Sequence, residues 1–565
     1  MNTNPLLKKK IFLFVTEFLS GVAVMGVETA ASRLLAPYFS SSQIVWTLII
    51  GTILIAMSIG NFLGGRLSDR HPDVTILYVL MLIAGAYICL IPFVGRYIIA
   101  LVSAMFALFV KSGLLIYASL TTCLILFVPP LMVLGMVTPS LIKYTMGNNE
   151  TSGKIVGILE ALNTLGSIIG TFIPTFLSIP TIGTNMTFAL FGGLICLIAL
   201  VYLFTGFIHD IHVRNNPEKF KEENSVRLKN IVKRGLLSFS MLAVSLAGVF
   251  LSVKTKFVFW NDETLVKEDE SMYNYLQVNE DDEAIYFSTN VMFGVQSMIK
   301  KDKSLTGMYY DYCLASTYMS SYDKKDKTDL LILGNGTGTF ATLVDKYIPS
   351  QQNITGVEID QKIIDLSHDV FMMPDSVNAV CDDGRAYIQR ASEKDKKYDV
   401  IMVDAYSSVS VPFQMATVEF FTEVKSHLKE DGVMVMNINM YGKQEKSLDQ
   451  ALSDTVSSLF DEVYAMKVPN GSGDELFASD NPDMVKRLGE SLSSITDSSL
   501  RNRMSYVYDN LEEHIDTGIR LYDDTADVEV RSMYALDDII SAELAYYQEI
   551  YKEKGFKGLL DYLLG

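Results

Sequence analysis

At 565 residues with a formal net charge of −18, the chain is too long for one ordinary domain. Its mean hydropathy is nevertheless positive, which is unusual for so acidic a protein, so we expect an apolar part and an acidic part in one chain. The 5 cysteines have no paired spacing and the 6 histidines form no ligand cluster, so the composition argues against a disulfide framework and a metal site.

The apolar part covers residues 1–253, which we expect to be a transmembrane helical domain. One span needs roughly 20 apolar residues, and by that measure the domain holds about seven or eight spans. The first apolar run follows Lys8, Lys9 and Lys10 but continues past the length of a signal peptide, so we interpret it as a span. The candidate spans are 11–36, 44–67, 74–96, 114–141, 154–180, 186–207 and 235–252, with 98–110 as a shorter apolar stretch.

Two of these spans carry residues that affect helix packing. Pro129 and Pro130 interrupt one of them, because proline lacks the N–H that a helix uses. Gly166 and Gly170 give another a small-residue face against which a neighbouring helix can pack closely.

Ionisable residues also fall within or near the spans, namely Glu17, Glu28, Arg33 and Glu160. Such groups are costly in hydrocarbon and usually face a protein interior or a cavity. Glu17 and Glu28 lie about three helical turns apart and therefore share a face. Two interpretations stay open: a polar pathway or substrate site in the bundle, or groups near the membrane surface that pair with neighbours.

The segment GNFLGGRLSDRHP, residues 60–72, resembles the loop between the second and third helices of major facilitator transporters. The spans would then match one half of that fold. A transporter of that kind has two halves, so this resemblance argues against ordinary transport.

Basic residues indicate the side of each loop, because loops rich in Lys and Arg stay in the cytoplasm. If 98–110 does not cross the membrane, there are seven spans and all three basic segments lie in the cytoplasm: the N-terminal lysines, the 60–72 loop and the linker 208–234. The seventh span then carries the globular part to the outside. An added span at 98–110 returns the globular part to the cytoplasm, where nucleoside cofactors are made. We expect a multi-pass protein of the cell membrane with a cytoplasmic globular part.

The acidic part divides near residue 328. Residues 254–328 hold short alternating runs, such as AIYFSTN and VQSMIKK, which predict a small antiparallel β region. Residues 329–565 alternate apolar runs with helical patterns, as buried parallel strands and crossover helices do. We therefore predict a doubly wound α/β domain with a ligand site at the carboxyl ends of its strands. The predicted strands are LLIL, ITGVEI, VNAVC, DVIMV and GVMVMNI.

A glycine-rich loop follows the first of these strands. Gly334, Gly336 and Gly338 lie between LLIL and a helical pattern, and glycine lets a backbone approach a ligand closely. The next strand ends at Glu358, where a carboxylate can accept both hydroxyls of a ribose. We interpret this unit as the site of a nucleoside-containing cofactor; the alternative is an ordinary glycine-rich turn.

Carboxylates follow two further strands. Asp382 and Asp383 follow VNAVC, and Asp404 follows DVIMV. One such Asp is more often a helix cap than a site residue, but parallel strands present their carboxyl ends at the same rim of a sheet. Together with Glu358, these carboxylates predict an acidic binding site beside the glycine loop.

Four segments resemble the spermidine synthase (polyamine aminopropyltransferase) family in their order and spacing: GNGTG, VEID, DDGRAYI and YDVIMVDAYSS. Further segments resemble the branch of that family that is fused to a membrane domain: GVETAASRLLAPYF, GVQS, MYYDY, VPFQMATVEFF, KEDGVMVMNIN and LYDDTADVEV. The resemblance implies a Rossmann-like domain of the class I S-adenosylmethionine transferase type. It is strongest from about residue 270 to 440.

The resemblance also implies roles for individual residues. The loop glycines would line the methionine-derived part of decarboxylated S-adenosylmethionine, Glu358 would hold its ribose, and Asp383 would accept a hydrogen bond from the adenine amino group. The implied residues are Gly334, Gly336, Gly338, Glu358, Asp382, Asp383 and Gly384 for the cofactor, Asp404, Tyr310 and Tyr406 for catalysis, and Gln296 and Tyr310 for the substrate.

The implied reaction moves an aminopropyl group from decarboxylated S-adenosylmethionine to a diamine such as putrescine. An ammonium is no nucleophile, so a carboxylate such as Asp404 must orient the amine and take its proton. The implied partners are a diamine or polyamine and the lipid bilayer. We expect no nucleic acid and no metal, and a homodimer stays open.

Two positions depart from the family pattern. Thr337 stands where the family has an acidic residue in the glycine loop, and Ser407 stands where it has a second Asp. Both changes weaken the pocket for cationic groups. Two alternatives therefore stay open: a methyltransferase that uses S-adenosylmethionine itself, and a non-catalytic transporter or sensor whose globular part binds a nucleoside or polyamine.

Overall fold

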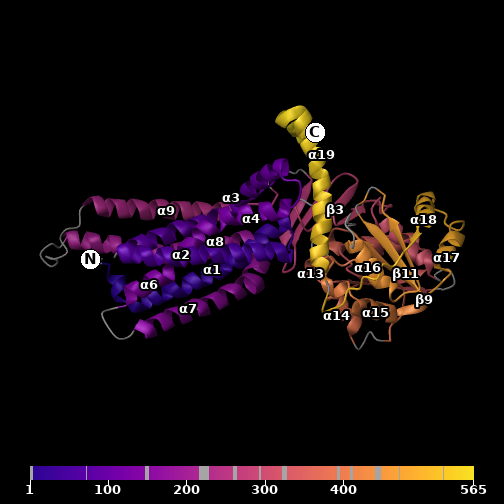
Figure 1. The fold of residues 1–565 in the computed structure, drawn as a ribbon, viewed down its shortest axis with the longest axis horizontal. Coiled ribbons are helices and arrows are strands. Elements are labelled where there is room, and N and C mark those ends of the chain that lie inside the picture. Colours follow the sequence, from indigo (N-terminus) through magenta and orange to yellow (C-terminus); the bar gives the residue numbers. More distant parts are fainter. Residues whose placement is uncertain are drawn as a thin grey trace. The chain divides into compact units, whose positions relative to one another are not determined.

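The computed structural model describes the chain except for residues 1–3, 72, 147–151, 216–227, 259–263, 292–293, 321–326, 391–394, 407–410, 440–446, 470, 472, 526 and 565. The chain forms two compact units, Met1–Phe109 with Leu115–Asn261 and Val110–Leu114 with Asp262–Gly565. Figure 1 shows the helices of the first unit in indigo to magenta and most of the second unit in orange and yellow.

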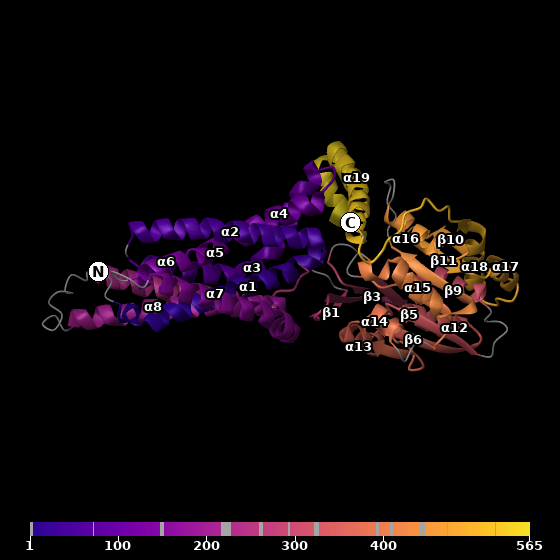
Figure 2. The ribbon, with the colours of Figure 1, turned by 60° about the horizontal axis from the view of Figure 1, so that its bottom comes forward.

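The first unit consists of long apolar helices that run along one another (Figures 1 and 2). α1 contacts α7 and α8, α2 contacts α5 and α6, and α3 contacts α8 and α9. The elements are η1 (Pro5–Lys8), α1 (Lys10–Phe39), α2 (Gln43–Arg70), α3 (Thr75–Phe109), α4 (Leu114–Leu126), α5 (Val128–Gly135), α6 (Val137–Thr145), α7 (Ser152–Ile173), η2 (Pro174–Ser178), α8 (Ile179–Asn215) and α9 (Leu228–Lys254).

Glycines allow α7 to lie directly on the backbone of α1. A Cβ built on Gly166 would lie 2.2 Å from the carbonyl oxygen of Phe18, and one on Gly170 would lie 2.2 Å from that of Val22. Any larger residue would therefore push the two helices apart. The small-residue face expected at these positions is the contact surface with α1.

Four helices in the described part of the chain are long and apolar enough to cross a membrane: Lys10–Phe39, Gln43–Arg70, Thr75–Phe109 and Gly153–Val213. Gly183, with a φ of 78°, breaks the longest of them between the predicted spans 154–180 and 186–207. The helix pair Leu114–Leu126 and Val128–Thr145 is bent by 49°, and if it counts as one span, the described residues hold up to five candidate spans. That bend lies beside Pro129 and Pro130, as their chemistry predicts.

The short apolar stretch that could have added a span differs from the observed helices. The stretch 98–110 is not a separate helix, because α3 continues through Phe109. An uninterrupted apolar pattern favours helix continuation, which explains the difference. The predicted span 235–252 lies in α9, where Ser238–Lys254 is a shorter apolar helix.

Glu17 is the most deeply buried of the expected ionisable groups, with a relative exposure of 0%. Its Oε1 accepts hydrogen bonds from Thr138 Oγ1 at 2.5 Å and from Asn163 Nδ2 at 2.8 Å. These partners lie on α6 and α7, so the cluster joins three helices. Glu17 therefore faces the interior of the bundle, as its position in an apolar helix requires.

The second unit begins with a four-stranded antiparallel sheet in the order β1-β2-β3-β4. One face of this sheet packs on α13 and the segment after it: Ile285 and Phe287 belong to the same apolar cluster as Ile363, Leu366 and Phe371. The strands are β1 (Leu265–Glu270), β2 (Tyr275–Glu280), β3 (Ala284–Ser288) and β4 (Ser297–Lys300).

A larger sheet forms the centre of the second unit. Its order among the described residues is β12-β10-β11-β9-β8-β5-β6-β7, and the pairs from β9 to β7 are parallel. Each of the five strands predicted from apolar runs is present, which confirms the α/β fold. The strands are β5 (Lys327–Leu333), β6 (Gln351–Glu358), β7 (Asn378–Cys381), β8 (Tyr398–Val403), β9 (Leu428–Ile438), β10 (Glu462–Lys467), β11 (Asp474–Ser479) and β12 (Glu512–Glu513).

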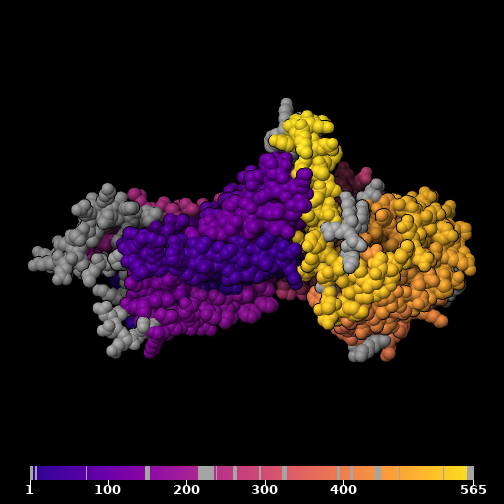
Figure 3. All heavy atoms as spheres, viewed as in Figure 1, coloured from indigo at the N-terminus to yellow at the C-terminus, as the bar shows by residue number. Residues whose placement is uncertain are grey.

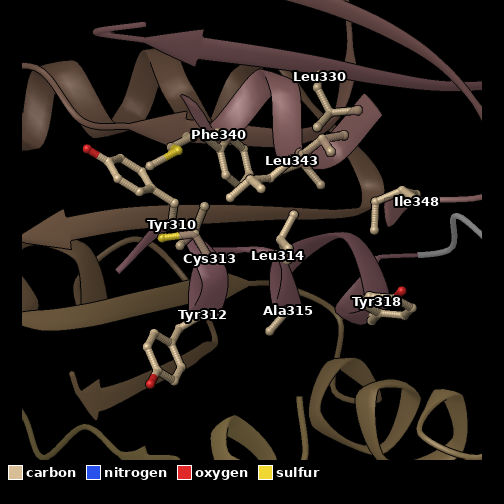
Figure 4. Close-up of a cluster of buried hydrophobic side chains, with 14 of the residues drawn as sticks. Tyr310, Tyr312, Cys313, Leu314, Ala315, Tyr318, Leu330, Phe340, Leu343 and Ile348 are labelled. Carbon is tan, nitrogen blue, oxygen red and sulfur yellow. The ribbon is translucent and has the colours of Figure 1, made fainter. Parts of the chain in front are cut away.

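Helices cover both faces of this sheet. Successive strand residues point to opposite faces, so Leu330 and Ile332 join one apolar cluster while Leu331 and Leu333 join the other. Figure 4 shows the first cluster, in which Phe340 approaches the short helix α10. The helices that pack on this face of the sheet are α10 (Tyr310–Cys313), α11 (Ala315–Met319), α12 (Thr339–Tyr347), α17 (Met484–Ser491) and α18 (Ser498–Asn510).

The opposite face packs on α14 (Gly384–Gln389), α15 (Val418–Ser426) and α16 (Leu448–Ser457). The last helix, α19 (Val528–Leu564), has a non-helical break at Gly555. It forms an extended yellow ridge on the surface in Figure 3. α13 (Gln361–Asp369) follows β6 and completes the βαβ connection to β7.

Candidate active site

A cavity of about 990 Å³ lies at the carboxyl ends of β5, β6 and β8. The order of the sheet reverses between β5 and β8, which is where open α/β sheets bind their ligands. Residues from the glycine loop, from the ends of β6 and β8, and from α19 line the cavity together. The structure therefore brings most of the predicted site residues to one place.

The three glycines of the loop all have positive φ, at 93° for Gly334, 51° for Gly336 and 80° for Gly338. A Cβ on Gly334 would lie 2.5 Å from the carbonyl oxygen of Asp404, and one on Gly338 would lie 2.3 Å from Met373 Sδ. Gly336 has open space instead and lines the cavity. Gly338 is not among the lining residues but forms the N-cap of α12, so its role is in the backbone turn.

Glu358 ends β6 and is buried, with 8% exposure. Its Oε2 accepts a hydrogen bond from the Gly336 N–H at 2.9 Å, and its Oε1 accepts one from the Asp360 N–H at 3.1 Å. Burial raises the pKa of Glu358 to about 7, and these hydrogen bonds oppose the rise. The carboxylate is thus fixed beside the glycine loop and faces the cavity.

Asp404 follows β8 and lies between two neutral donors. The hydroxyl of Tyr309 donates to Oδ2 at 2.6 Å, and Asn437 Nδ2 donates to Oδ1 at 2.8 Å. Burial raises the pKa of Asp404 to about 7, while the two hydrogen bonds favour its ionised form. A carboxyl group with that pKa can accept a proton near neutral pH.

Tyr309 and Asn437 were not among the predicted site residues. Tyr309 precedes Tyr310 in MYYDY, and a sequence pattern does not distinguish which of two adjacent tyrosines faces the site. Asn437 lies near the end of β9, the strand beside β8, so the same reasoning that located Asp404 could have found it.

Tyr310 and Tyr406 line the cavity, but their hydroxyls bond to backbone carbonyls. Tyr310 donates to the carbonyl oxygen of Gln296 at 2.6 Å, and Tyr406 donates to that of Asn437. The hydroxyl that contacts Asp404 is that of Tyr309. Tyr310 nevertheless lies close to Tyr309, with ring centroids 3.9 Å apart and ring planes tilted by 41°.

The segment after β7 contributes Asp383 and Gly384 to the cavity. Asp383 caps α14 by accepting a hydrogen bond from the Ala386 N–H at 2.8 Å. Asp382 does not line the cavity, because its side chain forms an ion pair with Arg390. Of the two adjacent aspartates, only Asp383 is placed to contact a ligand there.

The amide of Gln296 lines the cavity and fixes a loop. Its Oε1 accepts a hydrogen bond from the Thr289 N–H at 2.8 Å. Thr337 is buried, with 1% exposure, and its hydroxyl lies 2.5 Å from that of Ser297. The glycine loop therefore presents no carboxylate at this position, and Ser407 lies outside the described residues.

No group of three or more His, Cys, Asp and Glu residues suited to hold a metal ion occurs in the described part of the chain. The cavity is lined by carboxyls, of which Glu358 is buried and Asp383 and Asp404 are half-buried, together with tyrosines and the backbone of the glycine loop. Such an arrangement suits a nucleoside on the side of the glycine loop and a cationic amine beside Asp404.

Comparison with known proteins gives matches in this region. The Spermine/spermidine synthase domain family matches residues 310–473. A probable polyamine aminopropyl transferase of Bifidobacterium longum (strain NCC 2705) is 41% identical over 327 residues, covering 55% of this chain and 71% of that protein. A polyamine aminopropyltransferase of Vibrio vulnificus (strain CMCP6) is 29% identical over 241 residues, covering 41% of this chain and 78% of that protein.

Among solved structures, the spermidine synthase of Thermotoga maritima aligns with 50% of this chain and 88% of its own length. It is 17% identical, and the TM-score is 0.33.

Proposed function

The chain belongs to the polyamine aminopropyltransferase family, and we propose that it is a membrane-integral enzyme that transfers an aminopropyl group from decarboxylated S-adenosylmethionine to a diamine such as putrescine. Aminopropyl transfer follows from the family. The diamine, the roles of single residues and the membrane location are our proposals.

The observation that carries the residue assignments is the environment of Asp404. A protonated amine cannot attack carbon, so the enzyme must hold the amine and remove a proton from it. Asp404 is half-buried in the cavity wall, hydrogen-bonded to Tyr309 and Asn437, and has a pKa raised to about 7. We assign it the role of the proton acceptor, and we assign Tyr309 and Asn437 the role of positioning it.

The glycine loop and Glu358 suit the adenosine part of the donor. Gly336 offers open space at the cavity wall, and Glu358 is held beside it by the Gly336 N–H. A carboxylate at the end of the second strand can accept both ribose hydroxyls. Asp383 and Gly384 lie at the next strand end, where we place the adenine.

The proposed step balances as a displacement at carbon. The neutral amine nitrogen forms a bond to the aminopropyl carbon next to the sulfonium, and the bond from that carbon to sulfur breaks. The electron pair of the broken bond stays on sulfur, which leaves methylthioadenosine. The proton lost by the amine goes to Asp404, and the product is spermidine when the acceptor is putrescine.

For the first unit we propose a multi-pass location in the cell membrane. We place the second unit in the cytoplasm because nucleoside cofactors are made there; the stretch 98–110 adds no span to this argument, since it belongs to α3. The helices of the first unit expose large apolar side chains, such as Phe62 at 68%, Leu101 at 71% and Phe109 at 77%. An exposed apolar surface of that kind is unfavourable in water and suits lipid. Four helices of sufficient length and hydropathy support this location.

The proposal is tested by incubating the detergent-purified full-length protein with putrescine and decarboxylated S-adenosylmethionine. We expect spermidine and methylthioadenosine in equal amounts. A parallel reaction with S-adenosylmethionine itself is the control. Formation of S-adenosylhomocysteine there, without spermidine in the first reaction, would show a methyltransferase instead.

A further inference from the structure

One wall of the active-site cavity comes from α19, far along the chain from the glycine loop. The helix contributes Glu529, Leu536, Ile539, Ile540 and Glu543 to the lining. With 3.6 residues per turn, positions 529, 536, 540 and 543 fall on the same face of the helix. The cavity therefore meets a stripe that is acidic, then apolar, then acidic.

Glu529 is the residue of this stripe whose environment is incomplete. It is half-buried in the first turn of α19, and its Oε2 is shielded from solvent without a hydrogen-bond partner among the described residues. A shielded carboxylate oxygen without a donor is unfavourable. The helix N-terminus offsets part of that cost, but a cationic ligand in the cavity would supply the missing donor.

The stripe matches the chemistry of a diamine. Such a molecule has an ammonium at each end of a methylene chain, so it needs an anionic contact at each end and an apolar surface between them. Asp404 serves the reacting end in the function proposed above. Since Thr337 is bonded to Ser297 and carries no charge, the glycine loop does not supply a second anion.

We propose that Glu529 binds the ammonium at the non-reacting end of the diamine, with Leu536 and Ile540 beside the methylene chain. Glu529 is then a specificity residue that favours diamines over monoamines of the same length. This inference rests on the proposed function, since it assumes that the acceptor amine occupies the cavity.

The test uses calorimetric binding of putrescine and of 1-aminobutane to the full-length protein in the presence of methylthioadenosine. Binding does not require turnover, so the result is independent of whether spermidine is formed. We expect Glu529→Gln to weaken putrescine binding about tenfold, as loss of one charge-assisted hydrogen bond does. The affinity for 1-aminobutane, which has no second ammonium, should not change, and Glu529→Asp should restore part of the loss.

Glu549→Gln is the matched control, because Glu549 is an exposed residue of α19 that does not line the cavity. It should bind both amines like the wild type. A purely structural role of Glu529 at the helix N-terminus would lower the melting temperature and leave the ratio of the two affinities unchanged. An unchanged ratio of the two affinities in Glu529→Gln, including an equal loss for both amines, would overturn the inference. So would a wild-type protein that does not bind putrescine.

Discussion

Asp404 is positioned by residues from two other elements. Tyr309, just before α10, and Asn437, on β9, each donate a hydrogen bond to one of its oxygens. Burial raises its pKa to about 7 and the two donors oppose that rise. A base whose pKa lies near the working pH combines a useful ionised fraction with a useful affinity for the proton.

Replacing Tyr309 by Phe tests this arrangement. Without its 2.6 Å hydrogen bond, the ionised form of Asp404 loses stabilisation and the pKa rises from its value of about 7. Since the reaction needs ionised Asp404, the acid limb of the pH profile of kcat/KM should move to higher pH, and kcat near pH 7 should fall about tenfold. Tyr310→Phe is the control, because that hydroxyl bonds to the Gln296 carbonyl. A larger shift in Tyr310→Phe than in Tyr309→Phe would contradict the assignment.

For single residues, the sequence predicted the acidic side chains at the cavity better than it predicted their hydrogen-bond partners. The position of Glu358, Asp383 and Asp404 at the cavity could be predicted because the end of a parallel strand fixes where the next residue lies. Which of Asp382 and Asp383 lines the cavity could not be predicted, because it depends on the ion pair between Asp382 and Arg390. Which of Tyr309 and Tyr310 contacts Asp404 could not be predicted either, because it depends on where α10 begins.

At the level of elements, the glycine loop combines two different requirements. Gly338 has a φ of 80° and packs against Met373, whereas Gly336 has a φ of 51° and open space at the cavity wall. Gly338 is therefore required by the backbone turn and its packing. Gly336 leaves room for a ligand.

The two alanine substitutions should separate these requirements. Gly338→Ala adds a Cβ 2.3 Å from Met373 Sδ in a strained conformation, so we expect about 1–3 kcal/mol of destabilisation. Gly336→Ala should cost less stability but weaken methylthioadenosine binding, because its Cβ enters the cavity wall. Thermal unfolding and calorimetry measure the two effects. Equal changes in both variants would be inconsistent with this division.

The strands of the α/β domain were predictable because buried parallel strands are continuous apolar runs. The contribution of α19 to the cavity was not, because no local pattern relates residues 529–543 to a loop almost two hundred positions earlier. The extent of α3 was also mispredicted, since apolar composition alone does not mark where one helix ends and another begins.

For the whole molecule, the split between an apolar and an acidic part corresponds to two compact units. Composition reveals such a split, because a helical unit with an apolar exterior and a soluble-type α/β unit need different surfaces. The side of the membrane on which the second unit lies does not follow from composition, because the basic loops and the nucleoside cofactor favour opposite answers.

Cysteine labelling can decide that question. Among the cysteines, Cys381 is exposed, whereas Cys89, Cys123, Cys196 and Cys313 are buried. We expect a membrane-impermeant maleimide to label Cys381 only after intact cells are permeabilised, because we place the second unit in the cytoplasm. A Cys381→Ser variant should abolish the labelling. Labelling of intact cells would place the unit outside.

The most direct test of the account is the formation of spermidine by the wild type and by Asp404→Asn, with methylthioadenosine binding measured on both. We predict that the wild type forms spermidine and methylthioadenosine in equal amounts. The variant should be at least about 100-fold slower, as expected for loss of a general base, and should bind methylthioadenosine with unchanged affinity. A wild type that binds methylthioadenosine but forms no spermidine, or a variant as fast as the wild type, would contradict the account.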